Sequence, residues 1–193
     1  MNKPCLSISH RILWAGAAVA LTAIGGFIRI PFVPVPLTLQ TCAVYLSGAI
    51  LGARTALMSQ TVFLLLGLSG APVFTLGGGP GYVLQPTFGY LASFPLAAGL
   101  IGLRVGKRLP APDVRSLLAA FIPGMGVIHL CGVLVLYLNL KYIAGHPVSW
   151  AAAAWSGSLV LLPGELIKMA AAAMLTVRIL PRLQGFMTSG TGG

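Results

Sequence analysis

The stretch TALMSQTVFLLLGLSGAPVFTLGGGPGYVLQPTFGYLASFPLAAGLIGL, residues 55–103, contains no charged side chain. It is long enough for two bilayer-crossing helices with a loop between them, because one crossing takes about 20 apolar residues. In the whole chain of 193 residues, 57% are hydrophobic and only 7% are charged. A soluble domain carries about 25% charged residues. The sequence therefore predicts an all-α integral membrane protein with several crossings.

Six membrane-spanning helices are expected, over residues 12–30, 39–51, 55–68, 88–103, 117–140 and 163–181. The basic residues support this number, because cytoplasmic loops carry an excess of Lys and Arg. With the N-terminus inside, the outer segments hold only Arg29 and Lys141. The basic residues of the inner segments are Lys3, Arg11, Arg54, Arg104, Lys107, Arg108, Arg115, Arg178 and Arg182. An odd number of crossings would divide these clusters between the two sides.

These features predict one six-helix domain over residues 1–193, with both termini cytoplasmic. Residues 1–11 form the expected cytoplasmic N-terminus and residues 183–193 a flexible C-terminal tail. The first apolar run also allows a signal peptide, with Ala18 and Ala20 at the cleavage site. Because several spans follow, an uncleaved first helix is the simpler interpretation.

The sixth span has two possible starts, one near Ser156 with a kink at Pro163, and one at Pro163 itself. The second is preferred, because proline suits the first turn of a helix and residues 163–181 already span about 28 Å. Residues 146–162 then form an outer segment, expected as a helix at the interface. Trp150 and Trp155 would be its interfacial anchors.

PGELIK, residues 163–168, places an acid and a base three positions apart in a chain with only two acidic residues. Positions i and i+3 share one helix face, so Glu165 and Lys168 can point into one cavity. Ionisable residues in a span are costly and usually face the bundle interior. Two simpler interpretations remain: the pair only neutralises itself, or Lys168 extends to the headgroups.

The glycine-rich segment 77–90, GGGPGYVLQPTFGY, is the second candidate element of a binding site. Gly78 and its neighbours allow the backbone to approach a ligand closely. Phe74, Tyr82 and Tyr90 are the aromatic candidates for its walls, and their presence disfavours a merely flexible loop. A phosphate-binding P-loop is excluded, because no GK[ST] sequence follows the glycines.

Residues 34–40, PVPLTLQ, connect the first two spans and contain the third candidate. Prolines exclude a continuous helix here, and the alternation around Thr38 and Gln40 favours a short extended piece. The Gln40 amide offers a donor and an acceptor, which suits a cyclic urea or amide. The alternative is a hydrogen bond from Gln40 to a neighbouring helix.

Small residues recur at intervals of four in the first span, which allows close helix approach. Packing within the chain and docking of a partner subunit both explain them. The ridges contain Ala18, Thr22 and Gly26, with Gly16 and Ala20 beside them.

Several other functions lack support. The basic residues lie in clusters between apolar runs and not along one face, so the formal charge of +10 does not predict nucleic-acid binding. Cys5, Cys42 and Cys131 have no metal-like spacing, and no metal site is expected. His129 stands alone in the fifth span, so a protease site with Ser156 or Ser158 has no basis in spacing.

Three stretches together resemble the BioY family, the biotin-specific substrate-binding (S) components of energy-coupling-factor (ECF) transporters. They are PVPLTLQT (34–41), GGGPGYVLQPTFGYL (77–91) and PGELIK (163–168). The resemblance implies a six-helix S component in a prokaryotic cell membrane that binds biotin in an outward-facing pocket. It implies transport driven by a transmembrane coupling subunit and a pair of ABC-type ATPases, with no enzymatic activity and no cofactor.

Carried over to this chain, the resemblance implies that Glu165 and Lys168 form the family's polar pair. Tyr82 and Tyr90 match the glycine-rich loop, and Gln40 the first link. Phe74, Gly78 and Gln85 complete the expected biotin-binding residues. The candidates for docking of the coupling subunit are Gly16, Ala18, Ala20 and Thr22.

Two departures from the family pattern concern the same site. The family usually has aspartate at Glu165, and glycine at Gln85 and Phe88, which bears on the pocket's shape. Lys168 is the best candidate for the biotin carboxylate, and Glu165 either orients Lys168 or accepts from a ureido N–H. The alternatives are an S component for another small vitamin and an integral membrane enzyme with Glu165 or His129 as base.

Overall fold

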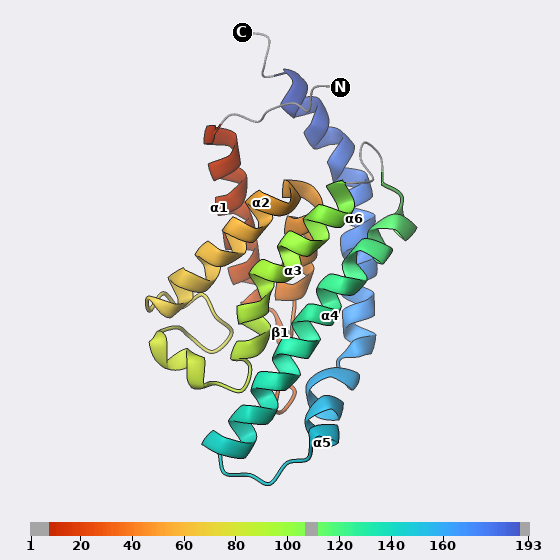
Figure 1. Cartoon of the computed structure of the whole chain (residues 1–193). Coiled ribbons are helices and arrows are strands. Elements are labelled where there is room, and N and C mark those ends of the chain that lie inside the picture. The colour runs from red at the N-terminus through yellow and green to blue at the C-terminus, as the bar shows by residue number, and fades with distance from the viewer. Residues whose placement is uncertain (1–7, 107–111, 190–193) are drawn as a thin grey trace.

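The computed structural model describes residues 8–106 and 112–189 of the chain, and it is almost entirely helical (Figure 1). The long helices are α1 (Ile8–Phe27), α2 (Gln40–Leu68), α3 (Phe88–Gly106), α4 (Val114–Leu138) and α6 (Leu162–Ser189). The short helices are η1 (Pro80–Leu84, 3-10), η2 (Asn139–Ile143, π), α5 (Trp150–Ala154) and η3 (Trp155–Leu159, π). Two strands, β1 (Arg29–Ile30) and β2 (Leu37–Thr38), complete the list. The all-α prediction is confirmed.

Five helical stretches in the described residues are long and apolar enough to cross a membrane. They are Ser9–Phe27, Gln40–Leu68, Phe88–Gly106, Val114–Ile143 and Trp150–Leu183. The chain is therefore a membrane protein. The predicted spans over 39–51 and 55–68 both fall within α2, and this accounts for the difference from the expected six.

Helix α2 contains a sharp bend between these two predicted spans. Gly52 has φ 74° and ψ 168°, which is not helical. In Figure 1 the first part of α2 rises toward the end where α1 begins, and the second part descends again. The first turn of α1 and the last turn of α6 lie at this same end (Figure 1).

Replacing Gly52 by alanine is expected to lower the free energy of unfolding by at least about 1 kcal/mol, because only glycine adopts this backbone conformation without strain. No heavy atom lies within 4 Å of an added Cβ at Gly52, so the loss would come from the backbone alone. Gly106→Ala, at the end of α3, is the control, since its Cβ also meets nothing. Thermal unfolding in detergent measures both; equal stability of the two variants would contradict the prediction.

Aromatic side chains from several helices form the core. The rings of Tyr45 (α2) and Phe121 (α4) stack with centroids 5.2 Å apart, and those of Phe63 (α2) and Phe94 (α3) stack at 6.3 Å. The second part of α2 lies against α3, which in turn packs against α4. Helix α6 contacts both α2 and α4. This arrangement brings the start of α6 next to the start of α2.

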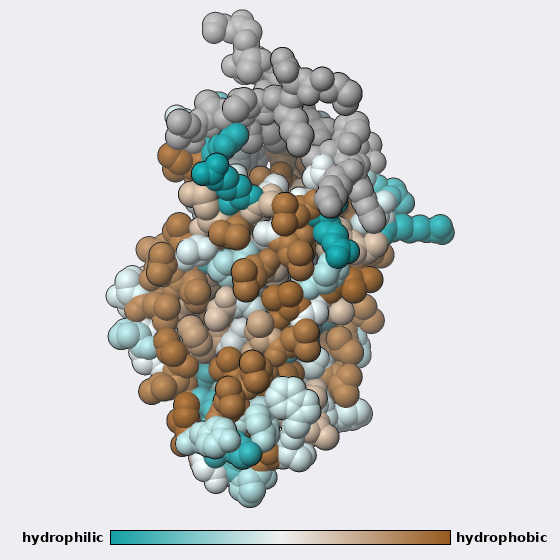
Figure 2. Space-filling model, in the orientation of Figure 1, coloured by the Kyte–Doolittle hydropathy of each residue, from teal (hydrophilic) through white to brown (hydrophobic). Residues whose placement is uncertain are grey.

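The outer surface is apolar where lipid would cover it. Large side chains such as Ile12, Leu130 and Ile167 are about 70% exposed. In Figure 2 hydrophobic residues cover the middle of the visible face, and hydrophilic ones gather toward its two ends. Such a surface is stable in a bilayer and unfavourable in water.

The second acidic residue of the chain, Asp113, caps α4. Its carboxylate accepts a hydrogen bond from the backbone N–H of Ser116 at 3.2 Å. The hydrogen bond with the Ser116 side chain, and to a smaller extent this backbone bond, lowers the pKa of the Asp113 carboxyl, because both favour the ionised form. Of the two acidic residues, Asp113 is thus explained by helix capping, while Glu165 lies inside the bundle.

The link between α1 and α2 is an antiparallel hairpin in which Arg29 pairs with Thr38 and Ile30 with Leu37. The short extended piece predicted around Thr38 is confirmed as β2. At the same end of the molecule lie the segment between α2 and α3, the short helix α5 and the start of α6 (Figure 1).

The boundaries of α6 concern two predictions. The helix begins at Leu162, next to Pro163, as preferred, and α5 and η3 precede it. Trp150 and Trp155 there are 50% and 63% exposed, as expected of interfacial anchors. However, α6 continues to Ser189, so most of the predicted tail over 183–193 is helical. Four residues named above, Lys3, Cys5, Lys107 and Arg108, lie outside the described residues.

Candidate functional site

A cavity lies at the end of the bundle formed by the hairpin, the α2–α3 segment and the start of α6. The cavity and its mouth together hold about 520 Å3 of space, which includes solvent at the opening. Its apolar wall is formed by Val35, Pro36, Leu37, Leu91, Phe94, Ile128 and Leu161. Its polar lining is formed by Thr38, Gln40, Thr41, Thr75, Tyr82, Thr87, Tyr90, His129 and Glu165.

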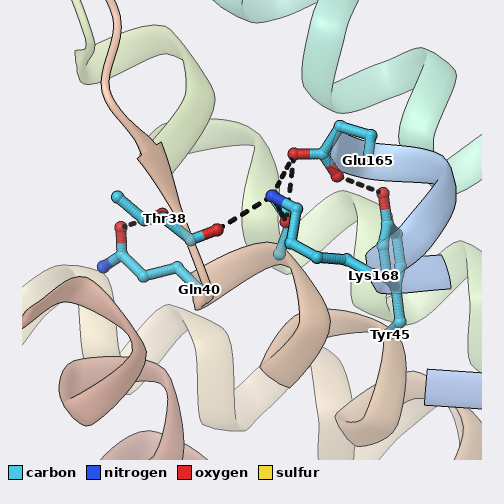
Figure 3. A network of polar contacts seen from close by, with 6 residues as sticks. Thr38, Gln40, Tyr45, Glu165 and Lys168 are labelled. Carbon is cyan, nitrogen blue, oxygen red and sulfur yellow. Dashed lines mark hydrogen bonds and ion pairs between the residues drawn. The ribbon is translucent and has the colours of Figure 1, made fainter. Parts of the chain in front are cut away.

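Glu165 and Lys168 form a buried ion pair at one side of this cavity (Figure 3). Only 4% of Glu165 and 6% of Lys168 are exposed. The carboxylate accepts further hydrogen bonds from the hydroxyls of Thr41 at 3.2 Å and Tyr45 at 3.1 Å. A charge is tolerated at this depth only when it is paired and hydrogen-bonded, and both conditions are met here.

The Lys168 ammonium uses all of its donors within the protein. Besides Glu165, it donates to the Thr38 carbonyl oxygen at 2.8 Å and to the Thr41 hydroxyl at 2.7 Å. A lysine ammonium has three N–H groups, and each of them has an acceptor. Lys168 does not line the cavity, whereas Glu165 does. The lysine thus fixes the carboxylate and ties α6 to the hairpin, while the carboxylate faces the open space.

The buried polar atoms without a partner are concentrated at the same place. Within residues 8–106 and 112–189, the buried side-chain nitrogen and oxygen atoms that lack a hydrogen bond belong to Gln40, Tyr82, Thr87 and His129. All four residues line the cavity. Buried polar groups are normally paired, so the cavity wall offers donors and acceptors to a molecule that fills it.

Neighbouring residues hold these groups in place. The Gln40 carbonyl oxygen accepts from the hydroxyls of Thr38 at 3.3 Å and Thr75 at 3.0 Å, which leaves its NH2 group as a donor. The Tyr90 hydroxyl donates to the backbone oxygen of Gly157, just before α6. Burial raises the pKa of the Tyr82 phenol, so Tyr82 stays neutral and can donate a hydrogen bond. These hydrogen bonds hold Gln40 and Tyr90 in fixed positions on the cavity wall.

Comparison with known proteins identifies the family of this chain. The family model described as "BioY family" matches residues 1–185. The chain belongs to the BioY family. One relative, a probable biotin transporter BioY from Lysinibacillus sphaericus, is 41% identical over 83% of this chain and 81% of its own length. Another, the biotin transporter BioY from Thermotoga maritima, is 35% identical over 88% of this chain and 95% of its own length.

A solved structure shares the fold of this BioY chain. It is the crystal structure of the S-component for biotin from an ECF-type ABC transporter. The two structures have a TM-score of 0.75 and 28% sequence identity, and the match covers 92% of each chain.

Besides Lys168, three of the residues predicted to bind biotin do not line the cavity of this BioY chain. Gln85 is exposed outside it. Phe74 is 1% exposed and lies behind Tyr82, with the two ring centroids 4.7 Å apart. Gly78 packs against the end of α2, where an added Cβ would lie 2.1 Å from the Ala71 oxygen. Phe74 and Gly78 position the segment between α2 and α3. The family pattern alone could not separate them from residues that border the cavity.

Other residues of the site were not predicted as ligand contacts. Thr41 and Tyr45 lie in the first and second turns of α2, and both donate a hydrogen bond to Glu165. Their spacing of four was a usable signal, because i and i+4 share a helix face. Thr75 and Thr87 come from irregular segments, where no sequence periodicity indicates which side chains face the cavity. His129 was recognised as the lone histidine of its span but was given no role in binding.

The structure places the predicted docking residues of α1 on two different sides of the helix. Ala18 and Thr22 are buried against α2, and the Thr22 hydroxyl contacts the Gln60 side chain. Their prediction as partner contacts is therefore corrected to packing within this chain. Gly16 and Ala20 lie on the exposed side of α1, so for these two the docking role stays a prediction.

Proposed function

We propose that this chain binds biotin in the cavity and acts as the S component of an ECF-type transporter for biotin uptake. The observation that carries the proposal is the concentration of unpartnered buried polar groups around one cavity with a buried carboxylate. The relatives are biotin transporters, and the solved structure with the same fold is a biotin S component. A transporter component, and not an enzyme, is the function that follows.

The lining of the cavity matches the parts of biotin. The apolar bicycle would lie against Leu91, Phe94 and Ile128, and the aromatic ring of Tyr90 adds a further wall. The ureido ring has two N–H donors and one carbonyl acceptor. Glu165 can accept from one N–H, because three hydrogen bonds leave part of its acceptor capacity free. The other polar side chains of the cavity can bind the ureido carbonyl oxygen and the carboxylate tail of biotin.

For the ion pair, we propose that Glu165 contacts the ligand and that Lys168 positions Glu165. This assignment replaces the expectation that Lys168 binds the biotin carboxylate, because its three donors are already used. Without Lys168, the buried carboxylate would lose its compensating charge and the contact that ties it to the hairpin. It would then no longer be held in position to accept an N–H of the ligand.

We expect Lys168→Ala to weaken biotin binding at least tenfold, or about 1.4 kcal/mol. The measurement is calorimetric titration of the detergent-purified chain with biotin. Lys141→Ala is the control, because Lys141 lies in η2, beyond the end of α4, does not line the cavity, and donates to the Tyr137 hydroxyl. Absence of biotin binding by the folded wild-type chain would refute the proposed function. Unchanged binding by Lys168→Ala would refute only the role of the pair.

The proposed topology has six crossings, with the two parts of α2 counted separately at Gly52 and both termini in the cytoplasm of a prokaryotic cell. Two observations support it. The described ends of α1 and α6 lie on the same side (Figure 1), as an even number of crossings requires. Arg54 and Arg104 lie close to the bend and to the end of α3, in the positions favoured for cytoplasmic basic residues.

Active uptake requires partners, because the sequence contains no P-loop that could bind ATP. The proposed partners are a transmembrane coupling subunit and a pair of ABC-type ATPases. Gly16 and Ala20 form the proposed contact on α1, since two exposed small residues four apart allow a partner helix to approach closely. The structural neighbour, which belongs to an ECF-type ABC transporter, supports this assembly.

A further inference from the structure

His129 combines burial with a complete lack of hydrogen bonds. It lies on α4, is 8% exposed, and has no partner at either ring nitrogen. One ring face is covered by Tyr90, edge to face, with centroids 6.2 Å apart. A neutral imidazole carries one donor and one acceptor. In His129 both are buried in the cavity wall, where water is largely excluded. Such a group is unfavourable unless a ligand pairs with it.

The other polar residues buried among the helices provide a contrast. Ser47, Ser59, Ser93 and Thr176 each donate to a backbone oxygen of their own helix. Thr22 and Gln60 bind each other across two helices. Their hydrogen bonds explain why they are tolerated in the core. An apolar side chain would pack equally well at position 129. The presence of an imidazole there therefore requires another explanation.

The depth of His129 selects the part of the ligand that it can reach. It lies nine residues before the end of α4, about 14 Å below the outer end of that helix at 1.5 Å per residue. The anionic tail of biotin is costly to bury and is best placed near the aqueous mouth. The neutral ring would therefore occupy the deep part of the cavity. His129 and Glu165 both line this cavity.

We propose that His129 hydrogen-bonds the cyclic urea of the bound ligand and thereby contributes to its selection. This inference rests on the proposed function and adds a residue on α4 to the site. Glu165 is only an acceptor and suits an N–H of the urea. His129 supplies the complementary N–H for the urea carbonyl oxygen, so the two side chains together recognise a donor and an acceptor on the same ring.

The test measures binding of biotin and of biotin methyl ester to wild type, His129→Phe and His129→Asn. The ester keeps the urea and removes the negative charge. His129→Phe is expected to weaken binding of both ligands by about tenfold, and His129→Asn to recover part of this loss because asparagine keeps a donor. His146→Phe, in the exposed loop after α4, controls for the loss of a histidine elsewhere.

Each other outcome overturns the inference in a different way. Equal binding of wild type and His129→Phe shows that the imidazole makes no contact. A loss for biotin but not for the ester assigns His129 to the carboxylate. If His129→Phe does not fold, His129→Asn decides by itself: it must bind both ligands more weakly than wild type and by the same factor. If wild type binds neither ligand, the proposed function fails first.

Discussion

Glu165→Leu is expected to lower the free energy of unfolding by about 3–5 kcal/mol, the largest effect that we expect from one substitution. It leaves the Lys168 ammonium buried without its counterion, and an unpaired buried charge costs this much. The hydroxyls of Thr41 and Tyr45 lose their acceptor as well. Unfolding in detergent, followed by helical circular dichroism against denaturant, measures the loss.

The double variant Glu165→Leu/Lys168→Met is the matched control for this interpretation. It removes both charges, so it should be more stable than Glu165→Leu alone although it carries one more change. A double variant that is destabilised less than the sum of the two single variants is the sign of a coupled pair. Biotin binding should remain lost in the double variant, because the acceptor for the urea is gone. If the single variant is as stable as wild type, the ion pair has no structural role.

Gly132→Val, on α4, is expected to cost about 3 kcal/mol of stability and to weaken biotin binding more than tenfold. A Cβ at Gly132 would lie 2.2 Å from a ring carbon of Tyr90. Tyr90 cannot move freely, because its hydroxyl is bonded to Gly157 and its ring packs on His129. Overpacking of a well-packed core costs about 1–3 kcal/mol, and here the displaced residue also lines the cavity.

Gly126→Val, two turns earlier on the same helix, is the control for this prediction. An added Cβ at Gly126 has no heavy atom within 4 Å. It therefore tests the effect of valine in α4 without the collision with Tyr90. Thermal unfolding and calorimetric titration of the two variants separate the effects. Equal biotin affinity of both variants would mean that the position of Tyr90 does not matter for binding.

Parts of the site could be predicted from the sequence because they depend on local rules. An acid and a base three residues apart must share a helix face, and a charge-poor chain can hold them in the membrane only inside the bundle. The pair at Glu165 and Lys168 follows from these two facts. The alternation around Thr38 likewise predicted the extended piece that precedes α2.

Which member of the pair faces the cavity, and which one positions the other, could not be predicted from local rules. Whether Lys168 or Glu165 faces the cavity depends on Thr38 and Thr41, which lie more than 120 positions away in sequence. They contact the ammonium because α6 packs against α2. The same reason explains why Phe74 and Gly78 do not line the cavity, since an irregular segment gives no indication of which side chains face it.

The sequence by itself determined that this protein lies in a membrane, is built of helices and carries a buried acid–base pair, since composition and helical spacing act along the chain. Only the tertiary structure decided that Glu165 faces the cavity, that Ala18 and Thr22 are internal, and that His129 lies unpaired on the cavity wall. These are properties of contacts between distant segments. Their energies depend on which groups the packing of the helices brings within a few ångströms of one another.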